Sequence, residues 1–543
     1  MPDFDVLIVG GGVAGLRAAI AAKRAGASVA MITKVHPLRT NSAVAAGGIN
    51  APLGTDDSVA DFVQDILAVG DNLSDPTIAS TLAAGARDEI IWLDRMGLPF
   101  NRDSKGLLAR RRLGANRRNR TCFADDRTGH LVLQVLYEQF QRERIPAFFD
   151  TFLTSLTAGD SVSSLGAIAL GLRTGRLDLL TARAVVLATG GFTRLYSPST
   201  ASIGTTGDGQ NVAYSAGARL MDMEMIQFHP TVFPGGPGLL ITEAALAEGA
   251  EIVDQDGKIL VASKFEPREK LSHLIFRAVQ NGSGQAFLDL RQLGKEKLAL
   301  ALPQTIELLD AVAGLDASKQ TVPIYPSAHR SIGGIQTDAD GSTSIRGLFA
   351  AGECSCNGVN GAGRLAGNTL TEMLVFGRRV GEAAASFARS EQKKNPASTR
   401  LNDEDRRLSL LTSSEASAGA DSPLKLYAEL GKLMNEKVGL VRDAASLQAA
   451  LNQVRVLKER HSGVRLRNGS RIYNFELTSH LEVGALLNVA ELVTIAAQTR
   501  TESRGAHHRS DFPQRNDSQW NCHTIVSQVD GSPRVSTSPA ASG

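Results

Sequence analysis

The sequence predicts an α/β protein in three parts: a doubly wound sheet domain, a second domain inserted into it, and a helical domain towards the C-terminus. Three observations predict this. A strand, a glycine-rich turn and a helix open the chain, two later apolar strands also end in glycine turns, and residues 424–500 carry apolar side chains at helical spacing. At 543 residues the chain is long enough for two or three domains.

The composition is that of a folded protein. Hydrophobic residues make up 43% and charged residues 21%, which is enough apolar material for large cores. The four cysteines are too few for a disulfide framework, which favours a reducing compartment. Because no run of about 18 apolar residues occurs, we expect no membrane-spanning helix, and we expect a cytoplasmic protein. Cys354 and Cys356 supply too few ligands for an iron-sulfur cluster, so we expect no metal site in this chain.

The first element is a βαβ unit. An apolar strand at 5–9 leads into Gly10, Gly12 and Gly15, in the pattern G-x-G-x-x-G, and then into an alanine-rich helix and a second strand at 28–33. In that context the glycines allow a tight turn and close backbone approach, and the helix N-terminus attracts pyrophosphate. The unit predicts a dinucleotide site, with a purely structural glycine turn as the alternative.

The end of the second strand lacks the acidic residue that usually binds ribose in NAD proteins, because Thr33 and Lys34 stand there. Two further strands, at 184–189 and 347–351, run into turns that begin at Gly190 and Gly352. Three such turns far apart in the sequence predict a nucleotide-binding domain assembled from separated segments.

We expect the following domain limits. Residues 1–226 and 335–385 form the two parts of the nucleotide-binding domain, 227–334 form the inserted domain, 424–500 form the helical domain, and 501–543 form a C-terminal tail. Between 383 and 401 a helical pattern gives way to a polar linker, and 413–422 reads as a flexible join. The tail beyond Val526 is expected to be mobile. The substrate would lie between the first two domains.

Five sequence blocks, in order, resemble the flavoprotein subunit of succinate dehydrogenase and fumarate reductase over nearly the whole chain. The resemblance implies a doubly wound FAD-binding domain, a capping domain and a C-terminal helical domain. It also implies an FAD-dependent oxidoreductase of electron transport that interconverts fumarate and succinate. The blocks are RTCFADDRTGH at 120–130, TGDG at 206–209, QFHPT at 227–231, the 328–334 stretch, and ESRGAH at 502–507.

The resemblance also implies which residues hold FAD. A backbone nest would take the pyrophosphate, and a carboxylate such as Glu353 can accept hydrogen bonds from ribose hydroxyls. For Asp208 and Glu353 the alternative role is turn capping. The expected cofactor-binding residues are Gly10, Gly12, Val13, Ala14, Gly15, Thr33, Lys34, Asn41, Gly47, Gly48, Asp208, Glu353, Thr369 and Leu370.

A small dicarboxylate is the substrate that the resemblance implies. Imidazole N–H groups can donate to a carboxylate, and an arginine can hold one with two hydrogen bonds. The expected substrate-binding residues are His229, Thr242, His329 and Arg364, and the expected catalytic residues are Arg268, which transfers a proton, and Glu243. The alternative is that these histidines are structural and that Arg268 only pairs with surface carboxylates.

The chain departs from the family pattern at four positions. Asn41 stands where many members attach FAD covalently through a histidine, so we expect non-covalent FAD. Covalent attachment raises the flavin potential in the family, so its absence favours fumarate reduction over succinate oxidation. Leu246 replaces an arginine of the proton relay, Asn360 replaces a histidine, and Leu113 replaces a phenylalanine near the substrate.

We expect an iron-sulfur subunit as partner and contact with the inner face of a membrane only through partner subunits. The arginine-rich segment 110–120 is expected to face solvent or a partner, not nucleic acid, because no aromatic side chains interleave to stack bases. Two alternative functions stay open. One is an L-aspartate oxidase, and the other is a flavin-binding assembly module without turnover.

Overall fold

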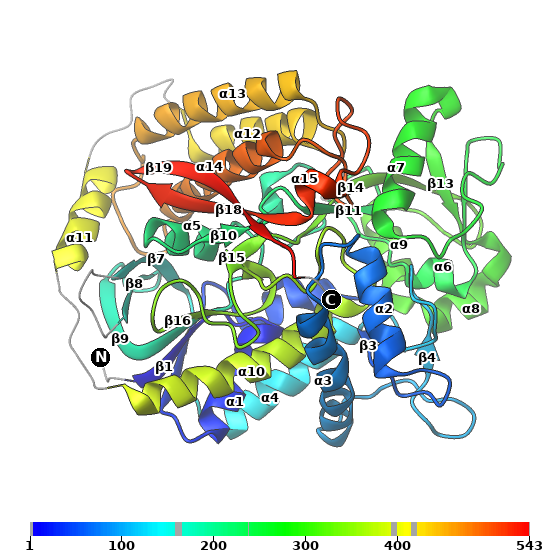
Figure 1. Cartoon of the computed structure of the whole chain (residues 1–543), viewed down its shortest axis with the longest axis horizontal. Helices are drawn as coiled ribbons and strands as arrows, with labels where there is room; N and C mark the ends of the chain where they lie inside the picture. The colour runs from blue at the N-terminus through cyan, green and yellow to red at the C-terminus, as the bar shows by residue number, and fades with distance from the viewer. Residues whose placement is uncertain (1–3, 158–164, 237, 392–398, 414–420, 542–543) are drawn as a thin grey trace.

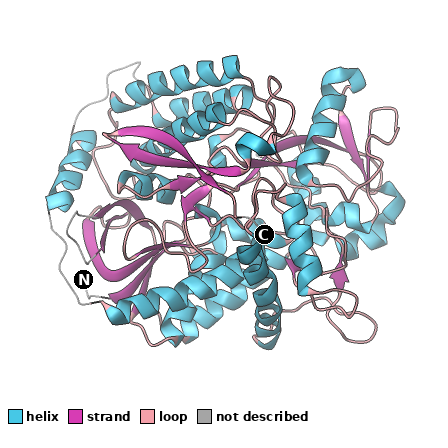
Figure 2. Cartoon of the chain, in the orientation of Figure 1, coloured by secondary structure: helices cyan, strands magenta, loops and turns pink. Residues whose placement is uncertain are grey.

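The computed structural model describes residues 4–157, 165–236, 238–391, 399–413 and 421–541. Figure 1 shows the main sheet with helices α1, α4 and α10 on the lower left, a second region in green on the right, and helices α12 and α13 at the top. Figure 2 shows magenta strands at the lower left with cyan helices lying below them.

A seven-stranded sheet forms the centre of the first domain. Its parallel part places β1 between β2 and β9, and two antiparallel strands extend it beyond β9. This arrangement confirms the predicted α/β doubly wound class. The strands are β1 (Phe4–Val9), β2 (Val29–Ile32), β6 (Ala147–Phe148), β7 (Thr151–Thr157), β8 (Leu165–Gly171), β9 (Leu177–Leu187) and β16 (Leu348–Ala350).

Helices α1 (Val13–Arg24) and α10 (Asn368–Ser390) pack closely against each other on this sheet. Glycines in α10 allow the approach, because a Cβ at Gly381 would lie 2.2 Å from the carbonyl oxygen of Ala18. Such a contact is far inside van der Waals distance, so a larger residue at this position would force the helices apart. The covering helices also include α2 (Val59–Val69), α3 (Pro76–Arg95) and α4 (Thr128–Arg142).

The glycine-rich turn after β1 needs its glycines for two different reasons. Gly10 has a φ of 115°, and a Cβ there would lie 2.2 Å from the carbonyl oxygen of Ala188. A Cβ at Gly15 would lie 1.9 Å from the carbonyl oxygen of Gly10. Gly10 therefore shapes the turn, whereas Gly15 lets α1 start directly beneath it.

The inserted region has its own antiparallel sheet and its own apolar core. Leu246, where the family has an arginine, is 3% exposed inside that core. We keep 227–334 as the proposed limits of this capping domain. Its elements are β11 (Ile226–Val232), α6 (Ala244–Glu248), β12 (Glu251–Val253), α7 (Arg268–Ala278), β13 (Ala286–Asp289), α8 (Gly294–Ala301), α9 (Pro303–Ala313) and β14 (Val322–Ser331).

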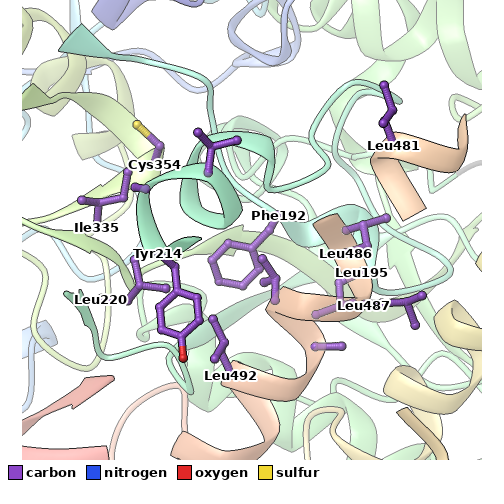
Figure 3. Close-up of a cluster of buried hydrophobic side chains, with 14 of the residues drawn as sticks. Phe192, Leu195, Tyr214, Leu220, Ile335, Cys354, Leu481, Leu486, Leu487 and Leu492 are labelled. Atoms are coloured by element: carbon purple, nitrogen blue, oxygen red, sulfur yellow. The ribbon is translucent and has the colours of Figure 1, made fainter. Parts of the chain in front are cut away.

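Three helices occupy the region in which the sequence predicts a helical domain: α12 (Pro423–Lys437), α13 (Ala444–Ser462) and α14 (Phe475–Thr499). Their apolar side chains share one core with the main sheet and with α5 (Asp208–Ser215). In Figure 3, Leu486, Leu487 and Leu492 of α14 lie with Phe192 and Tyr214 in this cluster. By length and composition α14 could cross a membrane, but 78% of its most apolar window is buried inside the protein.

The structure corrects two expectations about the C-terminal half. The tail beyond Val526, which was expected to be mobile, is part of a sheet. Its strands β18 (Cys522–Val529) and β19 (Ser532–Pro539) form a hairpin that pairs with β10 (Leu220–Met221). The pairing of Leu220 with Val526 buries the start of the hairpin, which the polar composition of the tail did not indicate. A helix, α11 (Thr399–Thr412), begins within the last residues of the predicted linker. Most of the linker beyond α10 and most of the expected join at 413–422 lie outside the described residues.

Short strands complete the fold. The sheet that holds the C-terminal hairpin also contains β15 (Gly334–Gln336) and β17 (Ser355–Cys356). A three-stranded sheet beside α10 is made of β3 (Ile49–Asn50), β4 (Arg110–Arg111) and β5 (Thr121–Cys122). This small sheet sets the position of the 41–48 loop, which lies next to the candidate site.

Candidate functional site

Two adjoining cavities lie at the carboxyl ends of the parallel strands, with empty volumes of about 840 and 700 Å³. They share Asn41, Ser42, Glu353 and Met373 in their linings, so one elongated ligand can extend through both. The first is lined by Gly10, Gly12, Val13, Ala14, Thr33, Lys34, Asn41, Asp208 and Glu353 of the predicted cofactor set. The second is lined by Asn41, Gly47, Gly48, Glu353, Thr369 and Leu370.

The position of Gly15 differs from that of the other predicted cofactor residues. It lies beneath Gly10, where its missing side chain leaves room for the turn, and the two cavity linings do not include it. Its contribution is to helix and strand packing. The fingerprint pattern could not separate these roles, because both require glycine.

Lys34 and Asp208 bind each other in the wall of the first cavity. The Nζ of Lys34 donates to Asp208 Oδ2 at 2.7 Å and to Glu482 Oε1 at 2.7 Å. Burial acts to lower the pKa of Lys34, but the two carboxylates outweigh it, so the net shift is upward. Lys34 is therefore a fixed cation that links the loop after β2 to α14.

Glu353 stands where the two cavities meet. Its Oε1 accepts hydrogen bonds from the backbone N–H of Ser331 at 3.1 Å and from the Ser331 hydroxyl at 3.3 Å. Burial raises the pKa of this carboxyl by more than Arg330 and Ser331 lower it. A Cβ at Gly191 would lie 2.3 Å from Glu353 Oε1, so the second glycine turn makes room for this carboxylate.

The 41–48 loop is tied down at both ends. The Oδ1 of Asn41 accepts a hydrogen bond from the backbone N–H of Ser202 at 2.9 Å. Arg111 donates to the carbonyl oxygen of Gly47 from Nε at 3.2 Å and from Nη2 at 2.8 Å. Burial lowers the pKa of Arg111 to about 10. These contacts hold the loop against the cavity that it lines.

The expectation that the arginine-rich segment faces solvent or a partner holds for only part of it, because residues 117–119 are exposed and other arginines are not. Arg111 and Arg120 are both buried, and Arg120 pairs with Asp57 at 2.9 Å and with Asp65 at 3.0 Å. A run of arginines looks like a charged surface in the sequence. Only the fold reveals the carboxylates that face it, because they lie more than fifty residues away in the chain.

All six predicted substrate-binding and catalytic residues line the second cavity. A bulge explains the placement of one histidine: Gln227 pairs with Arg330 and Phe228 pairs with Ala328, which leaves His329 as the extra residue of β14. The rings of His329 and His229 lie edge to face, with centroids 4.9 Å apart. The set is His229, Thr242, Glu243, Arg268, His329 and Arg364.

Both histidines are neutral. Burial, followed by the charge of Arg268, lowers the pKa of His229 and of His329 well below the ordinary value. His229 Nδ1 accepts a hydrogen bond from the backbone N–H of Thr231 at 3.3 Å, which assigns its proton to Nε2. A neutral imidazole can therefore donate from Nε2 without adding a second buried charge.

Arg268 is held by two hydrogen bonds to Glu243, with Nε to Oε1 at 2.8 Å and Nη2 to Oε2 at 2.7 Å. The sequence reading missed Gln227, which connects this pair to Arg364. Gln227 Oε1 accepts from Arg268 Nη1 at 3.1 Å and from Arg364 Nη2 at 2.8 Å. A signal existed, because Gln227 lies two residues before His229 in a strand and so shares its face.

The predicted substrate-binding and catalytic set combines two arginines with neutral imidazole donors in a buried cavity. Arg364 is 2% exposed and Arg268 is 9% exposed, so their charges are poorly screened by water. This arrangement suits a small molecule with two carboxylates. Over the described parts of the chain, no group of three or more His, Cys, Asp or Glu side chains is placed to hold a metal ion.

Comparisons with known proteins find relatives along nearly the whole chain. A family model described as FAD binding domain matches residues 5–370, and one described as fumarate reductase flavoprotein C-term matches 427–542. The chain is 36% identical to a fumarate reductase flavoprotein subunit of Mycobacterium tuberculosis, covering 99% of this chain and 97% of the relative. It is 34% identical to a succinate dehydrogenase flavoprotein subunit of Coxiella burnetii, covering 96% and 94%.

Solved structures give the same result. The chain superposes on a quinol-fumarate reductase with menaquinol molecules with a TM-score of 0.95, 34% identity, and coverage of 100% of this chain and 98% of the other. It superposes on Mycobacterium smegmatis Sdh1 in complex with UQ1 with a TM-score of 0.87, 32% identity, and coverage of 100% and 95%.

Proposed function

The chain belongs to the fumarate reductase and succinate dehydrogenase flavoprotein family, and from this premise we propose that it reduces fumarate to succinate with non-covalently held FAD. The family places it among the FAD-dependent oxidoreductases that act on CH–CH bonds. The direction of the reaction, the state of the FAD and the residue roles that follow are our proposal.

One observation carries it. The side chains of His229, His329, Arg268 and Arg364 converge on a cavity that adjoins the dinucleotide cavity. The two imidazoles and Arg364 would bind the carboxylates of fumarate, and Thr242 would add a hydroxyl donor. Thr369 and Leu370, in the first turn of α10, would hold the cofactor beside them.

When bound and reduced, FAD would supply the hydride that adds to one carbon of the substrate double bond. Arg268 gives a proton to the neighbouring carbon, and Glu243 holds the guanidinium at the position where this transfer occurs. The buried pair is suited to the role, because a guanidinium can act as a proton relay only in a site with little water. Leu246 cannot extend this relay, so Arg268 must recover its proton by a route that does not use position 246.

Purified protein is expected to release its FAD when it is precipitated with acid. The amide of Asn41 lacks the ring nitrogen through which family members form the covalent bond, and its oxygen already accepts a hydrogen bond from Ser202. The measurement is flavin absorbance in the supernatant and in the pellet. Flavin that stays in the washed pellet would show that a covalent link exists.

A panel of three substrates tests the proposed function directly. We expect turnover with fumarate and reduced dye, slower turnover with succinate and oxidised dye, and none with L-aspartate and oxygen. Activity with L-aspartate would favour an oxidase. Protein that binds FAD but is inert towards all three substrates would favour an assembly module without turnover.

We propose an iron-sulfur subunit as electron-transfer partner and a cytoplasmic location, with membrane contact only through partner subunits. The support is the family itself, together with the similarity to structures described as a quinol-fumarate reductase and as Sdh1 in complex with UQ1. Co-purification of the tagged chain from its native host, followed by iron analysis of the complex, tests this proposal.

A further inference from the structure

The second cavity contains an arginine that the proposed chemistry does not use. Arg330, in β14, lines this cavity, and its side chain is 3% exposed. Its Nη2 donates to Glu372 Oε2 at 2.7 Å. Its Nε and Nη1 are buried and have no hydrogen-bond partner within the described residues. Because buried N–H groups of a cation are costly when left unpaired, a bound group with acceptor atoms is the expected partner.

We propose that Arg330 contacts the cofactor: it is a fixed cation that donates to the polar edge of the flavin ring and raises the midpoint potential of the bound FAD. This inference rests on the proposed flavin site. It assigns a function to a residue outside the substrate-binding and proton-transfer set.

The chemistry of the ring fits the two free donors. The pyrimidine edge of a flavin offers carbonyl oxygens and ring nitrogens as acceptors, and a guanidinium presents neighbouring N–H groups in one plane. Reduction adds negative charge to the ring, whereas a guanidinium carries a fixed positive charge. In a buried site with little screening, the cation therefore favours the reduced cofactor over the oxidised one.

Surrounding groups fix Arg330 in place. Glu372 lies in α10 and accepts from both Arg330 and Asn360, the latter through Nδ2 at 3.1 Å. The same helix begins at the cavity, where Thr369 and Leu370 contribute to the lining. Its N-terminus carries a partial positive charge, which adds to the field of Arg330. Glu372 offsets part of that field, so the two side chains must shift the flavin potential in opposite directions.

Asn41 makes this assignment relevant to catalysis. Covalent attachment raises the flavin potential in the family that the chain resembles, and Asn41 cannot provide it. A buried cation can supply part of the same effect electrostatically. Arg330 would supply only part of it, so the potential stays below that of a covalently linked flavin and still favours fumarate reduction.

The test is the midpoint potential of the FAD-loaded protein, measured without substrate against a reference dye. We expect Arg330→Gln to weaken binding of reduced FAD about tenfold relative to oxidised FAD, which lowers the two-electron potential by about 30 mV. Arg330→Lys should retain part of the effect, and Glu372→Gln should raise the potential. The matched control is Arg379→Gln. Arg379 lies in α10, as Glu372 does, and its side chain is 37% exposed and pairs with Asp340. This control should leave the midpoint potential unchanged.

Two outcomes would overturn the inference. An unchanged potential in Arg330→Gln together with a raised KM for fumarate would place Arg330 on the substrate. Shifts of the same sign in Arg330→Gln and Glu372→Gln would indicate general disturbance of the site. The potential is measured without substrate, so this test does not depend on turnover. A protein that is inert towards fumarate would contradict the proposed function, but its flavin potential could still be measured. Should Arg330→Gln fail to fold, Arg330→Lys and Glu372→Gln still show whether the midpoint potential falls when Arg330 is altered and rises when the charge of Glu372 is removed.

Discussion

Arg268→Gln is expected to reduce fumarate turnover by about 10²–10⁴-fold, the usual contribution of a positioned proton donor. The glutamine can keep a hydrogen bond in the site but cannot deliver the proton. The measurement is fumarate-dependent oxidation of a reduced dye, with the FAD content of each sample determined from its absorbance. FAD should stay bound, because Arg268 does not line the first cavity, where the glycine-rich turn would hold the pyrophosphate.

The variant leaves Glu243 as a buried carboxylate without its partner, which could lower stability as well as activity. Arg268→Gln combined with Glu243→Gln removes that charge and should be equally inactive with a melting temperature nearer to that of the parent. Arg291→Gln is the matched control, since Arg291 pairs with Asp289 on the surface of the same domain. Normal turnover in Arg268→Gln would exclude Arg268 as the proton donor.

Arg500→Met is expected to lower the free energy of unfolding by about 3–5 kcal/mol, the cost of removing one partner from a buried ion pair. Arg500 is fully buried, with Nε donating to Glu224 at 2.7 Å and Nη1 donating to Glu502 at 3.0 Å. Its removal would leave both carboxylates without this partner, and the carbonyl oxygen of Cys522 would lose a donor at 2.7 Å. Urea unfolding followed by circular dichroism measures the change.

Arg460→Met provides the comparison. Arg460 also pairs with two carboxylates, Asp421 at 2.8 Å and Glu429 at 2.6 Å, but its side chain is 32% exposed. Surface pairs of this kind contribute about 0–1 kcal/mol. Equal losses in the two variants would mean that burial does not determine the strength of the Arg500 network.

The sequence predicted the parts of this molecule that depend on short-range patterns. The glycines after β1, with Gly10 at a φ of 115°, occur where only glycine fits, so the turn could be recognised directly. The convergence of His229, His329 and Arg364 on one cavity was inferred from the family resemblance, because their spacing alone indicates no shared site. The structure brings them together, whereas their roles await the experiments above.

The remaining features depend on contacts between distant segments. The C-terminal hairpin is polar along much of its length. Antiparallel pairing with β10, about three hundred residues earlier in the chain, holds it in place. The pairing of Lys34 with Glu482 joins the end of β2 to α14, and no local pattern indicates it. Arg330 has no motif of its own, and its importance rests on two donors that the described residues leave unpaired.

The route of the chain through the first cavity has a consequence for biosynthesis. The walls of that cavity come from residues between Val9 and Met373, so a ribosome must translate more than two thirds of the protein before the cavity can close. The edge of β10 receives its neighbour only when residues 522–529 have emerged. FAD loading is therefore a late event, and a chain that terminates early exposes both an open cleft and an unpaired strand to aggregation and proteolysis.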